Sequence, residues 1–142
     1  MKENYLINIE GTMEQSGEMD TVKLMTRGSF VRRNSSFFIS YQESEATGYA
    51  GNTTTVKVED GNKVTMLRHG TAPSRLVIER GRRHVCHYDS GYGVLSLGVA
   101  TDEIENHLTD SGGALTFSYT LDSGDAQISR NEVKITVQEA SR

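Results

Sequence analysis

The sequence of 142 residues is long enough to bury a core, and we expect a single domain spanning residues 1–142. Its hydrophobic fraction of 35% is low for a globular chain and suits a curved sheet with one solvated face. The net charge of −4 and the pI of about 5.5 argue against nucleic-acid binding, for which a basic surface is expected. No apolar run approaches the roughly 20 residues of a membrane-spanning helix.

Alternating apolar and polar residues predict three strands in the N-terminal third, because successive side chains of a strand point to opposite faces of the sheet. The first two are expected at residues 4–12 and 22–28, with a turn between them at 15–18. The third is expected at about 36–45, with one face formed by Phe37, Ile39, Tyr41 and Glu43.

The middle third continues the alternation through strands expected at residues 54–58 and 64–68. Between them, Asp60-Gly61 is the clearest hairpin signal in the chain, since both residue types accept the positive φ values of a tight turn. A loop that contains the only proline follows, and further short strands are expected at 76–78 and 82–88.

Along the next long strand, the apolar residues change from odd-numbered to even-numbered positions. Leu95, Leu97 and Val99 share one face, whereas Ile104 and Leu108 have the opposite parity. A one-residue β-bulge near residue 101 would cause that change. One helical turn is the alternative, because Ile104 and Leu108 are four residues apart. We favour the bulge, since no second turn of apolar residues follows.

Turns at residues 110–113 and 122–125 enclose a return strand, one face of which carries Leu115, Phe117, Tyr119 and Leu121. A final strand reaches Val137, with a second parity slip near Asn131. Turn signals thus recur about every ten residues, and no segment has convincing helical periodicity. The sequence therefore predicts an all-β fold, an antiparallel meander β-barrel of about 8–10 strands.

Several short motifs occur in a characteristic order: Tyr41-Gln42-Glu43, Gly48, Thr53-Thr54-Thr55, Arg68-His69-Gly70, Tyr88-Asp89-Ser90-Gly91-Tyr92-Gly93, Asn106, Gly112-Gly113, Tyr119 and Ser129-Arg130-Asn131. This pattern resembles the YwiB-like family of small bacterial proteins over nearly the whole chain. The resemblance implies a calycin-like (lipocalin-like) β-barrel. It implies no established activity and no catalytic residues.

Charge is divided unevenly along the chain. Residues 27–87 carry ten Lys or Arg against five Asp or Glu, whereas the remainder carries five against fourteen. Such polarity could steer an anionic partner to one side of the molecule. The alternative, which we favour, is that strands of the two segments pair, so that their charges interleave on a solvated face.

Residues 84–89 include histidine, cysteine and aspartate, the residue types that bind zinc. On a strand, however, His84 and Cys86 share one face while His87 and Asp89 share the other. The spacing matches no zinc motif, and we expect no metal site. The chain also lacks a nucleophile elbow and a glycine-rich phosphate loop. We therefore expect no cofactor and no catalytic residues, and favour a protein that is not an enzyme.

Two functions from different classes remain open. The first is the binding of a small molecule in the barrel interior. The second is an interaction or structural module that binds protein or RNA through its outer face or rim; arginines at 75–83 near Tyr88 and Tyr92 are the features that would suit RNA. A connected cavity would favour the first. Cys86 as the only cysteine, and an N-terminus without a signal peptide, lead us to expect a cytoplasmic protein.

The candidate ligand-binding residues are Tyr41, Glu43 and Arg68, because alternation aims all three at the barrel interior. A charge there is costly to bury unless it is paired or meets a polar ligand. In the structural interpretation, Glu43 and Arg68 bond each other or nearby backbone and stabilise the fold. In the functional hypothesis they anchor a ligand in a mostly apolar pocket, and Arg68 holds its acidic group.

Overall fold

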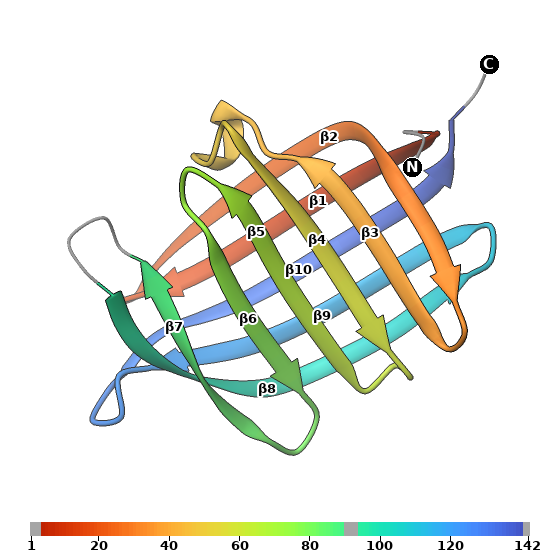
Figure 1. The fold of residues 1–142 in the computed structure, drawn as a ribbon. Helices are drawn as coiled ribbons and strands as arrows, with labels where there is room; N and C mark the ends of the chain where they lie inside the picture. The colour runs from red at the N-terminus through yellow and green to blue at the C-terminus, as the bar shows by residue number, and fades with distance from the viewer. Residues whose placement is uncertain (1–3, 90–93, 141–142) are drawn as a thin grey trace.

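The computed structural model describes residues 4–89 and 94–140, which form ten strands and one short 3-10 helix (Figure 1). The strands are β1 (Tyr5–Gln15), β2 (Glu18–Arg33), β3 (Ser36–Gln42), β4 (Asn52–Glu59), β5 (Lys63–Gly70), β6 (Ser74–Glu79), β7 (Arg83–Asp89), β8 (Val94–Thr109), β9 (Gly112–Asp122) and β10 (Gln127–Glu139). The helix η1 (Glu45–Thr47) lies between β3 and β4. Each strand pairs antiparallel with its neighbours in sequence, and β1 pairs with β10 to close the barrel. The predicted meander barrel is confirmed.

The strength of pairing differs around the barrel. β1 and β10 pair from Tyr5–Glu139 to Glu14–Arg130, so the closure of the barrel is a long ladder. In the described part of the chain, β6 and β7 pair only at Ser74–Tyr88, with one further bridge at their turn. The β6–β7 seam is therefore the least paired junction of this wall.

Two local predictions are confirmed. Asp60 and Gly61 have φ values of 53° and 64°, the left-handed pair that a tight hairpin between β4 and β5 requires. A register shift between Thr101 and Glu103 interrupts the β8–β9 ladder while β8 continues. The parity change near residue 101 is thus a β-bulge, and the helical alternative is wrong.

Two predicted strand boundaries and the predicted position of one parity slip are wrong. β2 does not end near Gly28 but runs to Arg33, because the turn is made at Asn34, whose φ is 56°. β3 ends at Gln42, although the Glu43 amide still donates to the Asn52 carbonyl at 2.8 Å. The parity slip in β10 lies between Gln127 and Ser129, before Asn131.

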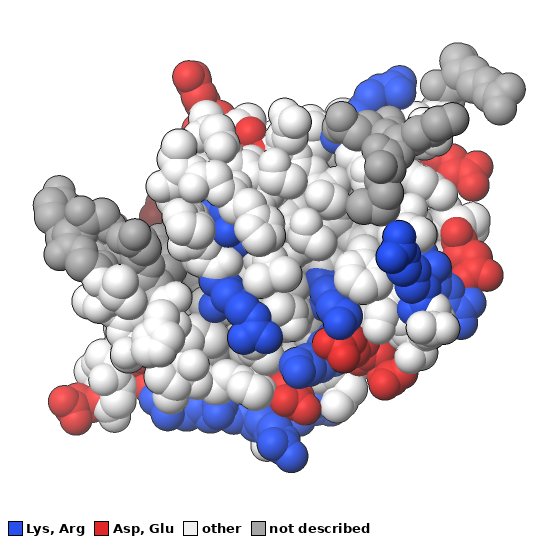
Figure 2. Space-filling model, in the orientation of Figure 1, with Lys and Arg blue, Asp and Glu red and all other residues white. Residues whose placement is uncertain are grey.

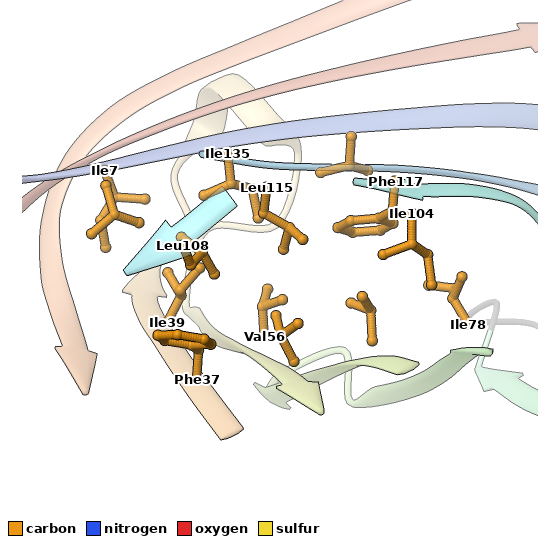
Figure 3. Close-up of a cluster of buried hydrophobic side chains, with 14 of the residues drawn as sticks. Ile7, Phe37, Ile39, Val56, Ile78, Ile104, Leu108, Leu115, Phe117 and Ile135 are labelled. Carbon is orange, nitrogen blue, oxygen red and sulfur yellow. The ribbon is translucent and has the colours of Figure 1, made fainter. Parts of the chain in front are cut away.

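The hydrophobic core fills one half of the barrel, and Figure 3 shows a cluster of its side chains between the strands. Cross-strand rows such as Phe30–Ile39–Val56 place bulky side chains opposite one another in the interior. Phe30 stacks on Phe37 with ring centroids 5.8 Å apart. The largest fully buried side chains are those of Phe117, Ile7, Ile39, Ile78, Leu115 and Ile135. We call this part of the barrel the filled half.

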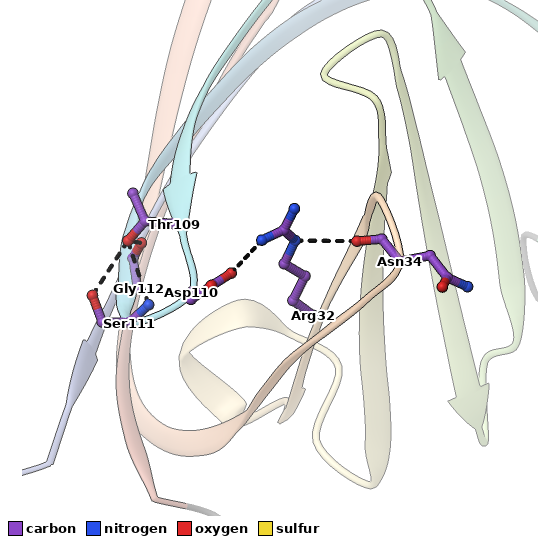
Figure 4. Close-up of polar contacts among 6 residues, drawn as sticks. All are labelled: Arg32, Asn34, Thr109, Asp110, Ser111 and Gly112. Atoms are coloured by element: carbon purple, nitrogen blue, oxygen red, sulfur yellow. Dashed lines mark hydrogen bonds and ion pairs between the residues drawn. The ribbon is translucent and has the colours of Figure 1, made fainter.

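A salt bridge closes the end of the filled half. Arg32, next to the β2–β3 turn, extends its guanidinium to Asp110 in the β8–β9 turn at 2.6 Å (Figure 4). Arg32 Nε also donates to the Asn34 carbonyl at 3.1 Å. Because both partners of the ion pair are largely exposed, we assign it a small contribution to stability and a role in joining two hairpins.

Strands of the two charge-biased segments pair only along their borders, at β1–β2 and β7–β8, so the expected interleaving of their charges does not extend across the barrel. Because the strands are arranged in sequence order, residues 27–87 form one continuous wall from the second part of β2 to β7. Figure 2 views the side on which β3–β6 face the viewer and shows Lys and Arg side chains across it, with Asp and Glu side chains between them at the lower edge. The acidic remainder of the chain forms the opposite wall.

Among the described residues, no helix has the length and apolarity needed to cross a membrane. The described helix, η1, comprises three residues.

Candidate functional site

The other half of the barrel contains an open cavity of about 530 Å³. This volume lies within the range of small-molecule sites. Ten strands enclose a wider interior than the eight that side chains can just fill. The wall of the cavity is mostly apolar and includes Ile9, Val22, Leu24, Met66, Leu76, Leu97, Leu121 and Val133. We call this part of the barrel the open half.

Small inward-facing residues explain why this half is not filled. Gly11 pairs with Val133 and Val22 on the two neighbouring strands, so its missing side chain leaves space in the interior. A Cβ atom built on Gly11 would meet no atom within 4 Å. Ser74 and Ser129 also line the cavity. The filled half has Phe, Ile, Leu and Val at the corresponding inward positions.

Polar side chains form a row across the wall of the open half. Tyr41 on β3 pairs with Thr54 on β4, Thr54 with Arg68 on β5, and Arg68 with Ser74 on β6. This polar row lies two residues along each strand from the apolar row Ile39–Val56–Met66–Leu76. Residues two apart share a face, so the polar row borders the apolar interior directly.

Arg68 is the least satisfied member of the polar row. Its Nε–H is buried and has no hydrogen-bond partner. Among the described residues, Arg68 makes no ion pair, and its guanidinium lies over the Tyr49 ring, 3.5 Å from Cζ to the ring centroid. Buried donors without a partner are rare in folded proteins and call for an explanation such as an absent ion, water or ligand.

Glu43 extends the polar row beyond the end of β3. Its Oε2 accepts a hydrogen bond of 2.5 Å from the Thr54 hydroxyl. The structural interpretation of Glu43 and Arg68 as partners is not what the structure shows, because no ion pair joins them among the described contacts. Each therefore presents its charge to the cavity separately.

Two tyrosines on the cavity wall are held in the neutral form. Burial raises the pKa of Tyr41 above its ordinary value; the Glu43 carboxylate adds to this increase, and Arg68 opposes it. Burial also raises the pKa of Tyr119 to about 12, again against the charge of Arg68. The guanidinium thus acts on phenols from both β3 and β9. Neutral phenols can donate hydrogen bonds to an acceptor in the cavity.

The segment between β3 and β4 supplies Tyr49. Ser44 caps η1 by accepting from the Ala46 amide, and Gly48 ends it with a φ of 83°. Asn52, buried at 3% exposure, donates through Nδ2 to the Tyr49 carbonyl at 2.9 Å and to Thr71 at 3.1 Å. Asn52 therefore fixes the backbone that carries Tyr49.

A second polar cluster lies on β10. Asn131 donates to the Ser129 hydroxyl at 3.0 Å, and both residues line the cavity. Asn131 pairs with Tyr119 across the β9–β10 ladder. The bulge before Ser129 turns these two side chains inward, so the cavity has polar groups on more than one wall.

The histidines of β7 make other contacts. His84 Nε2 lies 2.8 Å from Glu79 Oε1, and His87 Nδ1 lies 3.3 Å from the Ser96 hydroxyl. Cys86 is buried. Among the described residues, no three potential metal ligands lie together. Residues 90–93 lie outside the described residues.

The stacking candidate Tyr92 falls in that segment.

The alternation of inward and outward side chains correctly predicted that the three site residues face the barrel interior. Tyr41, Glu43 and Arg68 all lie on the cavity wall, and their role in binding stays a prediction. Sequence reasoning placed Tyr119 on an inward face but did not assign it to the site. Tyr49 and Gly11 were missed, since Tyr49 lies in a segment without periodicity and a glycine carries no apolar signal.

Comparisons with known proteins agree with this architecture. The model of a family described as a domain of unknown function, DUF1934, matches residues 7–135. The uncharacterized beta-barrel protein YwiB of Bacillus subtilis (strain 168) is 24% identical over 132 residues, which cover 93% of this chain and 91% of that protein. The crystal structure of the ywiB protein from Bacillus subtilis matches with a TM-score of 0.82 at 20% identity, covering 96% of this chain and 92% of that chain. The chain therefore belongs to the DUF1934 family of β-barrel proteins.

Proposed function

We propose that the protein binds a small, partly apolar molecule with an acidic group in the open half of its barrel, in the manner of calycin-like barrels. The observation that carries this proposal is the Nε–H of Arg68, which is buried without a hydrogen-bond partner, on a residue that lines a cavity of about 530 Å³. A buried N–H donor without an acceptor is costly. An acidic ligand would supply the acceptor, while the apolar wall would take the rest of the molecule.

The arrangement supports binding rather than catalysis. Tyr41 and Tyr119 present neutral phenols to the same cavity and Glu43 presents one carboxylate, and no nucleophile with an adjacent base lies among the described residues of the cavity wall. We propose the cytoplasm as the compartment, on the basis of the single cysteine.

The first test fills the cavity without touching its polar groups. Gly11→Leu places a side chain in the open half, where a Cβ atom meets nothing within 4 Å. We expect the variant to fold with an unchanged or higher Tm and to bind a fluorescent, dansyl-labelled fatty acid at least tenfold more weakly. Glu10→Leu is the matched control, because alternation directs residue 10 to the outer face of β1; its affinity should equal that of the parent.

The second test removes the charges. Arg68→Met keeps the length of the side chain and removes an unpaired buried donor, so we expect unfolding free energy to rise by about 1 kcal/mol while probe affinity falls. Glu43→Gln should alter affinity less, because the Thr54 hydroxyl can still donate to an amide oxygen. A parent protein that binds no probe, together with an Arg68→Met variant of lower stability, would assign both residues to the fold alone.

The alternative is an interaction module that uses the outer face or rim. The specific observation in its favour is that Val85 on β7 and Val94 on the neighbouring strand β8 are 60% and 68% exposed, while Leu95, 50% exposed, lines the cavity. Exposed apolar side chains on neighbouring strands suit a protein partner. If this alternative holds, Val94→Lys should abolish partner binding and leave the affinity for the fatty-acid probe unchanged, and Gly11→Leu should have no effect on the partner.

A further inference from the structure

The guanidinium of Arg68 is oriented by an aromatic ring. Its Cζ lies 3.5 Å from the centroid of the Tyr49 ring, which is the separation of two planar groups stacked in van der Waals contact. Stacking covers one face of the guanidinium and leaves its N–H donors directed outward in its plane. Nε–H is one of these in-plane donors and is without a partner. A ligand that completes this site must therefore accept hydrogen bonds in that plane.

A carboxylate meets this requirement better than other acidic or polar groups. Its two oxygens and the carbon between them are planar, and they match two parallel N–H donors of an arginine. A sulfonate is tetrahedral at sulfur, so when two of its oxygens lie in the guanidinium plane, its third oxygen and its tail lie on opposite sides of that plane, one of them on the side that the Tyr49 ring covers. An alcohol offers one oxygen and no charge. Because one face of the guanidinium is covered, the site distinguishes anions by their shape as well as by their charge.

The neighbouring groups are compatible with a carboxylate. Tyr41 and Tyr119 stay neutral, since burial raises the pKa of each, and they can donate to an anion on the cavity side. The backbone that carries Tyr49 is fixed by the two hydrogen bonds that Asn52 donates. The ring is therefore positioned before a ligand arrives, which lowers the cost of ordering the site.

Resting on the ligand-binding function proposed above, we propose that the Arg68 site selects a carboxylate over other head groups on the same apolar tail, with Tyr49 as the specificity-determining residue. The ligand class is a monocarboxylic acid with an apolar tail that occupies the open half. The ring contributes shape selectivity, and the guanidinium contributes the attraction.

The test compares three ligands that share one tail: decanoate, decanesulfonate and decanol, each titrated calorimetrically into the parent protein. We expect decanoate to bind about tenfold more tightly than decanesulfonate, and decanol to bind most weakly. Tyr49→Phe keeps the ring and should keep this order. Tyr49→Leu and Tyr49→Ala remove the ring and should bring the ratio of the two acids close to one, with decanol affinity nearly unchanged.

The outcomes separate this inference from the proposed function. Equal binding of decanoate and decanesulfonate by the parent, or an unchanged ratio in both Tyr49→Leu and Tyr49→Ala, would refute the selectivity and leave the pocket in place. Binding of none of the three ligands would refute the proposed function and this inference with it. Thermal unfolding of each variant shows that a change in ratio comes from a folded protein.

Discussion

Tyr41 and Tyr119 carry their phenol groups into the barrel interior, where the phenolate form of each is disfavoured. Their side chains are 4% and 7% exposed, and a phenolate there would lose most of its hydration. Arg68 offsets part of this effect, because its positive charge favours the phenolate. Burial is the larger influence on both residues.

The raised pKa of Tyr119 predicts a loss of stability at alkaline pH. An unfolded tyrosine titrates near pH 10, whereas Tyr119 in the fold holds its proton up to about pH 12. The folded state therefore binds more protons in that interval, and its stability, fully present below pH 10, is lost as the pH rises through 12. Urea unfolding measured from pH 8 to 12 gives the free energy of unfolding at each pH. We expect this free energy to fall by roughly 2 kcal/mol less in Tyr119→Phe than in the parent. Parallel curves for parent and variant would contradict the prediction.

For single residues, the sequence predicts the direction of a side chain where the residue belongs to a strand. The parity of Phe37, Ile39 and Tyr41 is enough to aim Glu43 inward, and the same holds for Arg68 after Val64 and Met66. Tyr49 follows η1 and lies between two left-handed glycines, Gly48 and Gly51, and its position over Arg68 depends on hydrogen bonds made by Asn52. Such contacts are set by the tertiary fold, so no local pattern predicts them.

Among the elements, β2 shows how a glycine in a strand can be mistaken for its end. Gly28 pairs with Tyr41 and lies inside the ladder. A Cβ atom there would come within 2.4 Å of Ile7 Cδ1 and of the Ser40 carbonyl oxygen. The residue is a glycine because neighbouring strands approach closely, and β2 continues to Arg33. In contrast, the bulge in β8 was predictable, since it changes the parity of several large apolar residues.

Two glycines in adjacent strands therefore give a matched pair of substitutions. Gly28→Ala forces a methyl group against backbone and should lower the unfolding free energy by about 1–3 kcal/mol. Gly11→Ala adds the same methyl group where nothing lies within 4 Å, and should be neutral or slightly stabilising. Urea unfolding monitored by circular dichroism measures both. Equal effects of the two substitutions would show that the close approach at Gly28 is not present in solution.

Over the whole molecule, the sequence-ordered meander divides the barrel in two ways. Around the circumference it separates a basic wall from an acidic wall, because each charge-biased segment forms consecutive strands. Along the axis it separates the filled half from the open half. Alternation predicts which residues face inward but not how completely they fill the interior, since that depends on the number of strands and on small residues from several of them.

Two leucines of β9 can test whether the barrel is divided into a filled half and an open half. Leu115 and Leu121 share the inward face of one strand, but Leu115 is fully buried in the filled half, whereas Leu121 is partly buried on the cavity wall. Leu115→Ala should cost about 2–5 kcal/mol, because it removes packed contacts and creates a cavity. Leu121→Ala should cost about 1 kcal/mol, because part of its surface already faces empty space.

The measurement is urea unfolding of both variants, without and with saturating decanoate. A ligand that packs on Leu121 gives this side chain contacts that it lacks in the free protein, and binding to the folded state adds to stability by mass action. The cost of Leu121→Ala should therefore increase in the presence of decanoate, while the cost of Leu115→Ala stays the same. Equal costs for the two leucines in the free protein would mean that the open half is filled in solution, and the cavity would then have no room for a ligand.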